Sequence, residues 1–185
     1  MARLVDRSNL PRHSISLRRS DPHPYGTPAM SPSQLLTADR IVMLVEPGDA
    51  KTVLEIAARL LSGDSPANTA LIADSLHARE RMGSTAIGYG IAIPHGRSAA
   101  FDHARGAFLR LAHPLAFGAS DGQPVDLLFA LAVPEHFTQQ HLQLLADLAE
   151  RFADADYRAA LRSAPDVDAL HTLLMSERAS RSAAA

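Results

Sequence analysis

The stretch VDLLFALAV (residues 125–133) is the strongest indication of the fold, because its last seven residues, Leu127 to Val133, are all apolar. A strand with one wet face alternates apolar and polar residues, whereas a strand covered on both faces is apolar almost throughout. Pro134 then ends the run. Seven residues are far short of the ~20 that an apolar helix needs to cross a bilayer. The stretch therefore predicts a buried strand, and no membrane insertion is expected.

Strands and helices alternate on either side of this segment. Residues 106–111 and 41–45 are short apolar runs that predict two more strands. Apolar residues at helical spacing behind a capping residue predict helices. The first helix is expected at residues 52–62, capped by Asp49, and the second runs from Pro66 to the turn before Gly83, capped by Asp64 or Ser65. A third is expected at 139–153, capped by Thr138. Two short helices are expected at 157–161 and 167–174. The alternation predicts an α/β fold.

The composition excludes several classes of protein. The chain has 185 residues, and its 18 basic and 20 acidic side chains give a formal charge of −2, which argues against a cationic nucleic-acid binder. Cysteine is absent, so disulfides, Cys-ligated zinc, iron–sulfur clusters and thiol catalysis are excluded. Apolar residues make up 46%, enough for a buried core.

The first 30 residues differ from the rest. They carry five arginines against Asp6 and Asp21, a charge of +3 that leaves −5 for the remainder, and four of the twelve prolines. They have no helical or alternating apolar period and no apolar segment of the kind found in secretory signals. We expect residues 1–33 to be a disordered basic tail, or a segment upstream of a true start at Met30. Residues 34–176 would form the domain, and residues 177–185 a frayed end.

Histidine is the residue type to examine for a catalytic role, because the chain has nine histidines and no cysteine. His95 stands out within GSTAIGYGIAIPHGR (residues 83–97), where an apolar strand would end at Pro94 and place the imidazole at a loop. Gly90 and Gly96 permit close approach of a backbone or a phosphate. Side chains at strand ends in α/β proteins commonly form binding sites. A turn histidine without function remains an equal alternative on this local pattern.

Three further features could assist His95. His141 falls in the first turn of the helix expected after Thr138, where backbone N–H groups favour an anion. Arg79 offers paired donors for phosphate oxygens, and Ser84-Thr85 adds two hydroxyls. A neutral histidine nucleophile with these neighbours would suit phosphoryl transfer. Separately, Arg79 could be a solvated helix charge, and Ser84-Thr85 a helix cap.

Other catalytic and cofactor motifs are missing. Gly88-Tyr89-Gly90 lacks the third glycine of a dinucleotide-binding loop, and the sequence has no GxxxxGK[ST] or HExxH motif. No acidic cluster accompanies the histidines. We therefore expect no metal and no bound cofactor.

Three segments, in order, carry a family resemblance. The run at 83–97, with its approach ARERMGST (78–85), resembles the active-site signature of the type-2 enzyme IIA domains of the bacterial phosphotransferase system (PTS), the fructose/mannitol superfamily. GQPVDLLFALAVP (122–134) and HLQLLADLAERFAD (141–154) continue the match, which covers roughly residues 34–175. The nitrogen-regulatory members are the most similar, although they more often have Gly and Asn where this chain has Ala86 and Tyr89.

The resemblance implies both a fold and a set of site residues. The fold would be a mixed sheet of five strands flanked by helices on both faces. His95 matches the histidine that accepts a phosphoryl group on Nε2 from a histidine-containing phosphocarrier protein. His141 and Arg79 match the residues that stabilise the phosphoryl group, and Ser84, Thr85, Gly90 and Gly96 would support the loop.

Two functions remain open after this comparison. In the first, the phosphohistidine is a switch by which a cytoplasmic protein regulates partners, such as sensor kinases or potassium transport components, as the resemblance implies. In the second, the protein relays phosphoryl groups to a fructose/mannitol-type sugar permease domain. The glycine-rich loop resembles the regulatory members, so we favour the first. A binding module without chemistry is disfavoured, because His95, His141 and Arg79 are all present.

Overall fold

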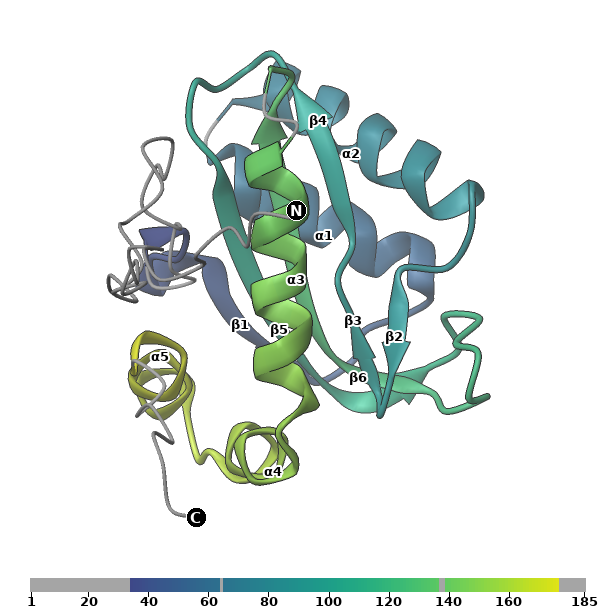
Figure 1. The fold of residues 1–185 in the computed structure, drawn as a ribbon, viewed down its shortest axis with the longest axis vertical. Helices are drawn as coiled ribbons and strands as arrows, with labels where there is room; N and C mark the ends of the chain where they lie inside the picture. The colour runs from purple at the N-terminus through teal and green to yellow at the C-terminus, as the bar shows by residue number, and fades with distance from the viewer. Residues whose placement is uncertain (1–33, 64, 137–138, 177–185) are drawn as a thin grey trace, which may run out of the picture.

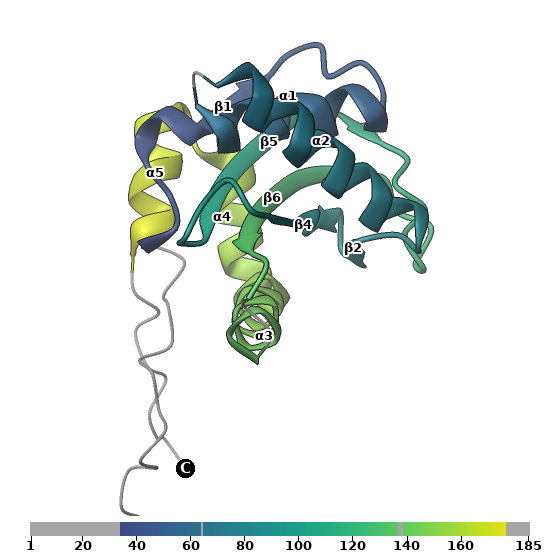
Figure 2. The ribbon, with the colours of Figure 1, turned by 90° about the horizontal axis from the view of Figure 1, so that it is seen from above.

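The computed structural model describes residues 34–63, 65–136 and 139–176, which form a mixed sheet between two layers of helices (Figure 1). Helices α1 (Ala50–Ser62) and α2 (Pro66–Arg81) cover one face. Helices α3 (Gln139–Ala153), α4 (Ala155–Ser163) and α5 (Val167–Met175) cover the other. Figure 2 shows α1 and α2 on the opposite side of the sheet from α3. The predicted α/β class with helices on both faces is confirmed.

Within the described residues, the sheet has six strands where five were expected. They are β1 (Ile41–Leu44), β2 (Ala86–Gly88), β3 (Ile91–Ala92), β4 (His95–Ser98), β5 (Arg105–Leu115) and β6 (Val125–Pro134). Their order is β1-β5-β6-β3-β2, and β4 also pairs with β6. β3 and β4 both run parallel to β6, one after the other. The extra strand arises because this line is interrupted at Ile93 and Pro94, and proline has no N–H for a ladder.

Strand β6 lies at the centre of the fold. It is antiparallel to β5 on one side and parallel to β3 and β4 on the other. Leu127, Phe129, Leu131 and Val133 face the cluster under α3, α4 and α5, whereas Val125, Leu128, Ala130 and Ala132 face the cluster under α1 and α2. All eight are buried. The prediction of a strand covered on both faces is confirmed.

Several helix starts follow local capping chemistry. The Asp49 carboxylate accepts a hydrogen bond from the Thr52 N–H at 2.7 Å and caps α1, as predicted. Ser65 accepts from the Asn68 N–H and caps α2, whose first residue is Pro66, which settles the choice between Asp64 and Ser65. Thr138, the expected cap of α3, lies outside the described residues.

Further differences from the sequence prediction concern β5 and the segment before β1. Strand β5 extends to Leu115 rather than residue 111, because Leu115 pairs with Val125 beyond an irregularity in the ladder. A 3₁₀ helix, Ala38–Arg40, precedes β1 and was not expected. Within the described part of the chain, no helix is both long and apolar enough to cross a membrane. The expected terminal tails lie outside the described residues.

Candidate functional site

His95 is the first residue of β4, directly after the interruption in the sheet. Its backbone is paired with Leu131 of β6, and its side chain is half-buried. The sequence suggested a histidine beyond the end of a strand, on an open loop. That expectation is corrected: β3 ends at Ala92, and Pro94 breaks the ladder only briefly before pairing resumes at His95. The ladder therefore holds the backbone of His95 in place.

Both ring nitrogens of His95 have a hydrogen-bond partner. Nδ1 lies 2.8 Å from the Ile93 carbonyl oxygen, which can only accept, so Nδ1 carries the proton. Nε2 then has a free electron pair and accepts a hydrogen bond from the Arg79 Nε–H at 3.0 Å. The ring is thus held in the tautomer whose Nε2 can act as a nucleophile.

Arg79 comes from the last turn of α2. Besides Nε2 of His95, its guanidinium donates from Nη1 to the Gly83 carbonyl oxygen at 2.8 Å, just beyond the helix end. The second contact fixes the orientation of the guanidinium plane beside the imidazole. Arg79 is therefore in direct contact with the candidate nucleophile and is not an independent charge in solvent.

His141 lies in the first turn of α3 and approaches His95 from the other helical layer. The two ring centroids are 5.2 Å apart, and the rings meet edge to face at 77°. The His141 side chain is 8% exposed, and its Nε2 is buried without a hydrogen-bond partner. A buried imidazole nitrogen without a partner costs free energy unless a ligand satisfies it. The structure brings His95, His141 and Arg79 together.

The surroundings favour uncharged imidazoles. Burial lowers the pKa of His141 to about 4, and the neighbouring His95, Arg97 and Arg79 side chains act in the same direction. Burial also lowers the pKa of His95, partly offset by the hydrogen bond to Ile93. Both rings are therefore neutral at pH 7. Neutral nitrogens beside the cationic Arg79 form a suitable environment for an anionic group.

The two hydroxyls predicted near the site are engaged within the protein. Ser84 Oγ donates to the Phe117 carbonyl oxygen, and Thr85 Oγ1 donates to the Glu80 carboxylate at 2.6 Å. Neither hydroxyl proton is directed at an incoming group in this arrangement. Both residues hold the segment that leads from α2 into β2.

The two glycines of the predicted site permit close packing of the protein on itself. A Cβ at Gly96 would lie 2.6 Å from Ser75 Oγ, so the glycine lets α2 pack directly on β4. Gly90, at φ +77°, forms the turn between β2 and β3 with Tyr89, at φ 58°. A Cβ at Gly90 would lie 2.5 Å from Nη2 of Arg162. These contacts account for both glycines through neighbouring protein atoms.

Sequence reasoning did not find two contributors to this arrangement. Glu80 accepts the Thr85 hydroxyl and N–H, and the Ile93 carbonyl fixes the His95 tautomer. The spacing of Glu80 and Thr85 in ARERMGST was a possible signal, but nothing in the sequence shows where a carbonyl points. Among the described residues, no group of three or more His, Asp or Glu side chains is placed to hold a metal ion.

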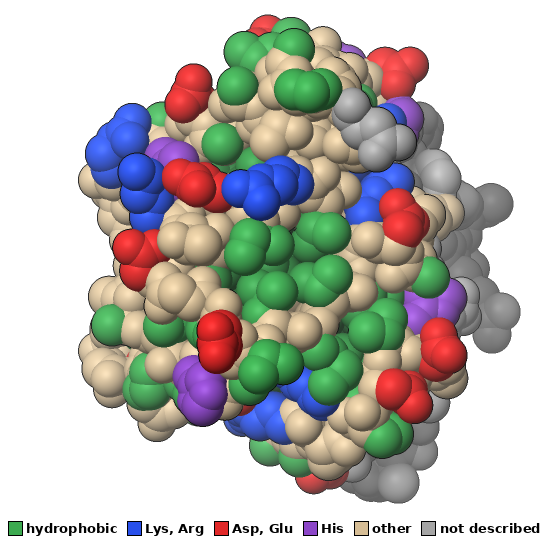
Figure 3. Space-filling view, turned by 180° about the vertical axis from the view of Figure 1, so that it is seen from behind, with side chains coloured by type: hydrophobic (Ala, Val, Ile, Leu, Met, Phe, Trp, Pro, Cys, Tyr) green, Lys and Arg blue, Asp and Glu red, His purple; other side chains and the backbone are tan. Residues whose placement is uncertain are grey.

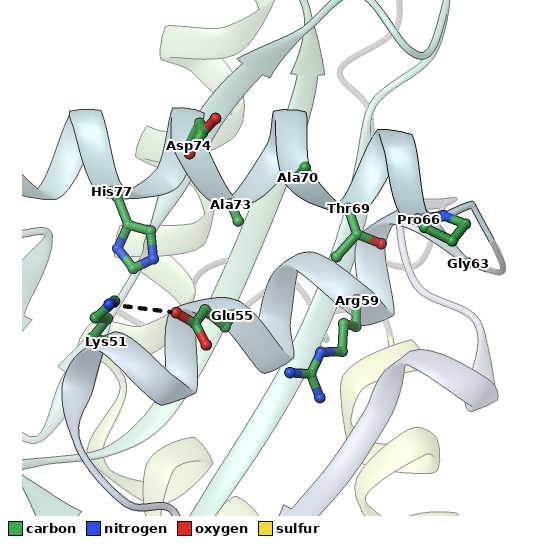
Figure 4. A pocket seen from close by; sticks show the side chains of 10 residues that line it. All are labelled: Lys51, Glu55, Arg59, Gly63, Pro66, Thr69, Ala70, Ala73, Asp74 and His77. Atoms are coloured by element: carbon green, nitrogen blue, oxygen red, sulfur yellow. Dashed lines mark ion pairs between the residues drawn. The ribbon is translucent and has the colours of Figure 1, made fainter.

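A groove between α1 and α2 lies apart from this cluster. Figure 3 shows that face of the molecule, with hydrophobic side chains gathered in its middle between charged ones. The groove has a volume of about 740 Å³ and contains the Lys51–Glu55 ion pair, at 3.9 Å (Figure 4). None of its lining residues is a predicted site residue. The residues that the sequence suggests for chemistry therefore lie around His95 and outside this groove.

Comparison with known families defines the class of protein. Residues 34–177 match the family "Phosphoenolpyruvate-dependent sugar phosphotransferase system, EIIA 2". The match covers the sheet, helices α1 to α5 and the His95 cluster. The chain belongs to this EIIA family, as the sequence resemblance implied.

Individual relatives give a narrower comparison. The chain is 45% identical over 143 residues to a "Nitrogen regulatory protein" of Pseudomonas aeruginosa, covering 77% of this chain and 93% of the relative. It is 42% identical over 125 residues to the protein of that name in Escherichia coli, covering 67% of this chain and 77% of the relative. The crystal structure of the nitrogen regulatory protein IIA-Ntr from Neisseria meningitidis matches with a TM-score of 0.72 and 39% identity, covering 77% of this chain and 97% of that one. Within the family, the chain is therefore similar to nitrogen regulatory IIA proteins.

Proposed function

We propose that this protein carries a phosphoryl group on Nε2 of His95, received from a histidine-containing phosphocarrier protein, and regulates partner proteins according to its phosphorylation state. The observation that carries the proposal is the pair of bonds to the His95 ring, in which Nδ1–H is held by the Ile93 carbonyl and Nε2 keeps its electron pair. Membership of the EIIA family supports phosphoryl transfer as the chemistry.

The transfer would need no proton to move. The Nε2 electron pair of His95 forms the new N–P bond while the N–P bond of the donor phosphohistidine breaks, and that bond's electron pair returns to the donor imidazole. The proton stays on Nδ1 throughout, hydrogen-bonded to the Ile93 carbonyl oxygen. Because positioning and charge stabilisation dominate phosphoryl transfer, a fixed neutral imidazole is the main requirement on the acceptor side.

Arg79 and His141 would stabilise the phosphoryl oxygens. Arg79 Nε–H occupies the position that phosphorus must take, 3.0 Å from Nε2, so the guanidinium must release Nε2 during attack. It then lies beside the new phosphoryl group, while its bond to Gly83 keeps it nearby. The unpartnered Nε2 of His141 offers a second polar contact from the opposite side.

A regulatory role is supported by the relatives and by the surface next to the site. The named relatives are nitrogen regulatory proteins. Two large apolar side chains, Met82 and Leu142, are exposed close to site residues along the chain, at three residues from Arg79 and next to His141. A doubly charged group added to the segment of surface that contains these residues would change which partner binds there. For this regulatory role we propose that the protein is located in the cytoplasm.

Labelling by the phosphocarrier tests the proposal. The protein is incubated with phosphoenolpyruvate and the carrier system, and wild type should gain ~80 Da of acid-labile phosphate. The His95→Gln variant should gain none, and His141→Ala should be labelled more slowly at the same position. Full labelling of His95→Gln would refute the assignment.

A second measurement distinguishes regulation from relay. The phosphorylated protein is mixed with a purified acceptor domain of a fructose/mannitol-type permease, and the phosphate on each protein is followed over time. Retention of the phosphoryl group is expected for a regulator. Rapid transfer to the acceptor would establish the relay function instead.

A further inference from the structure

Both ring nitrogens of His95 are linked to the same turn of α2. Nε2 is bonded directly to Arg79, while Nδ1 is connected to the next residue, Glu80, through a chain of three contacts. These contacts run from the Glu80 carboxylate to Thr85, then to the backbone of Ile93, and then to the His95 ring. Figure 1 shows the corresponding path from the end of α2 through β2 and β3 to β4.

The first contact fixes Thr85 on Glu80. The Thr85 N–H lies 3.2 Å from both carboxylate oxygens, and its hydroxyl donates to Oε2 at 2.6 Å. Thr85 is only 5% exposed, so water competes little for these bonds. Hydrogen bonds to an ionised acceptor are about twice as strong as neutral ones. The backbone of Thr85 is thus held to the end of α2.

The second contact fixes the backbone of Ile93. Ile93 falls in the interruption between β3 and β4, so its N–H is not part of a strand ladder and instead donates to the Thr85 carbonyl oxygen at 3.0 Å. On the other side, the Pro94 carbonyl accepts from the Leu131 N–H at 2.8 Å. The direction of the Ile93 carbonyl therefore depends on Thr85 on one side and on β6 on the other.

The third contact selects the tautomer of His95. The Ile93 carbonyl accepts the Nδ1 proton at 2.8 Å. The alternative tautomer would place a proton on Nε2, opposite the Arg79 Nε–H, and leave no electron pair for attack. A small rotation of the Ile93–Pro94 peptide unit would turn the carbonyl away from Nδ1 and weaken this selection, because hydrogen bonds weaken steeply as their geometry departs from linear.

We propose that Glu80 and Thr85 are positioning residues that keep His95 in its Nδ1–H tautomer through the backbone of Ile93. This inference rests on the proposed phosphoryl transfer at His95. Neither residue touches the transferred group, and their effect on the reaction is exerted through the acceptor ring. The break in the sheet at Pro94 is what makes the Ile93 carbonyl available for this purpose.

Nitrogen-15 NMR of the histidine rings in the full chain tests the proposal at pH 7.5. The His95 signals are identified by their loss in His95→Gln. Wild type should show a protonated Nδ1 and an unprotonated Nε2. In Glu80→Gln and Thr85→Val the two nitrogen shifts should move toward each other as the tautomers mix, and the rate of phosphorylation should fall about tenfold. Thr85→Ser retains the hydroxyl and should keep both properties.

Asp166→Ala is a matched control, because it also removes a carboxylate that accepts a backbone N–H, that of Ala169 at 2.8 Å, at the start of α5. It should lower stability without changing the ring signals. If Glu80→Gln and Thr85→Val lose stability in the same way but keep the Nδ1–H tautomer and the rate, the pair is structural and the proposal is overturned.

Two further outcomes are informative. If Glu80→Gln does not fold, the comparison of Thr85→Val with Thr85→Ser decides the question. If wild type is not phosphorylated at all, the proposed function fails, but the ring signals still show whether Glu80 and Thr85 set the tautomer.

Discussion

Between pH 7.5 and pH 5, wild type is expected to lose about 2 kcal/mol more stability than the His141→Gln variant. The pKa of His141 is lowered from 6.5 to about 4, chiefly by burial. The unfolded chain therefore takes up a proton at this ring below pH 6.5, while the folded protein does so only near pH 4. The contribution is present above pH 6.5 and is lost as the pH falls, because the unfolded state binds more protons in that interval.

The magnitude follows from the pKa difference. Each pKa unit corresponds to ~1.4 kcal/mol, so the 1.5 units between 6.5 and pH 5 correspond to about 2 kcal/mol. The loss approaches roughly 3 kcal/mol at pH 4. The lowered pKa of His95 acts in the same direction and remains in the variant. A glutamine at position 141 has its own cost, but that cost is the same at both pH values and cancels.

Urea unfolding followed by circular dichroism at pH 7.5 and pH 5 measures the effect. The free energy of unfolding should fall by about 2 kcal/mol less in His141→Gln than in wild type. His113→Gln is the control, because that side chain is exposed on β5, and it should lose as much as wild type. Equal losses in wild type and His141→Gln would show that the ring is not buried in its neutral form.

Three further predictions concern the surroundings of the site. Gly96→Ala should lower the free energy of unfolding in urea by about 1–3 kcal/mol, because its Cβ would lie 2.6 Å from Ser75 Oγ. Adding Ser75→Ala should recover part of this loss, and no recovery would contradict the packing argument. Arg79→Lys should slow phosphorylation at His95 by at least about tenfold, since an ammonium cannot reproduce the planar guanidinium, and an unchanged rate would exclude direct contact. Arg162→Ala should cost about 1–3 kcal/mol, because the guanidinium bonds two oxygens of Asp126 and the carbonyl of the β2–β3 turn; an unchanged unfolding midpoint would count against that role.

The main elements of the fold could be predicted because their signals are local. The apolar run at residues 125–133 indicates a strand buried on both faces, and the structure places alternate side chains of β6 in two separate clusters. Asp49 and Pro66 mark helix starts through chemistry within one turn. In each case, neighbours along the chain determine the outcome, so a reading of adjacent residues suffices.

The interrupted strand could not be predicted in the same way. The sequence predicts that a strand ends at Pro94, yet pairing with β6 resumes at His95. Whether a proline ends a strand or only interrupts it depends on the partner strand, which here continues past it. The same tertiary context explains why the bonds of Ser84 and Thr85 were not foreseen, since their acceptors are the Phe117 carbonyl and Glu80.

The location of the site between the two helical layers explains how distant segments form one cluster. Arg79 belongs to α2 on one face of the sheet, and His141 belongs to α3 on the other, yet both contact the His95 ring. His95 can be reached from both layers because it lies at the interruption in the sheet, opposite Leu131. The central strand β6 therefore supports the site twice, since it pairs with His95 and its end at Pro134 precedes α3. Displacement of β6 would move both histidines, so the geometry for phosphoryl transfer depends directly on the packing of the core.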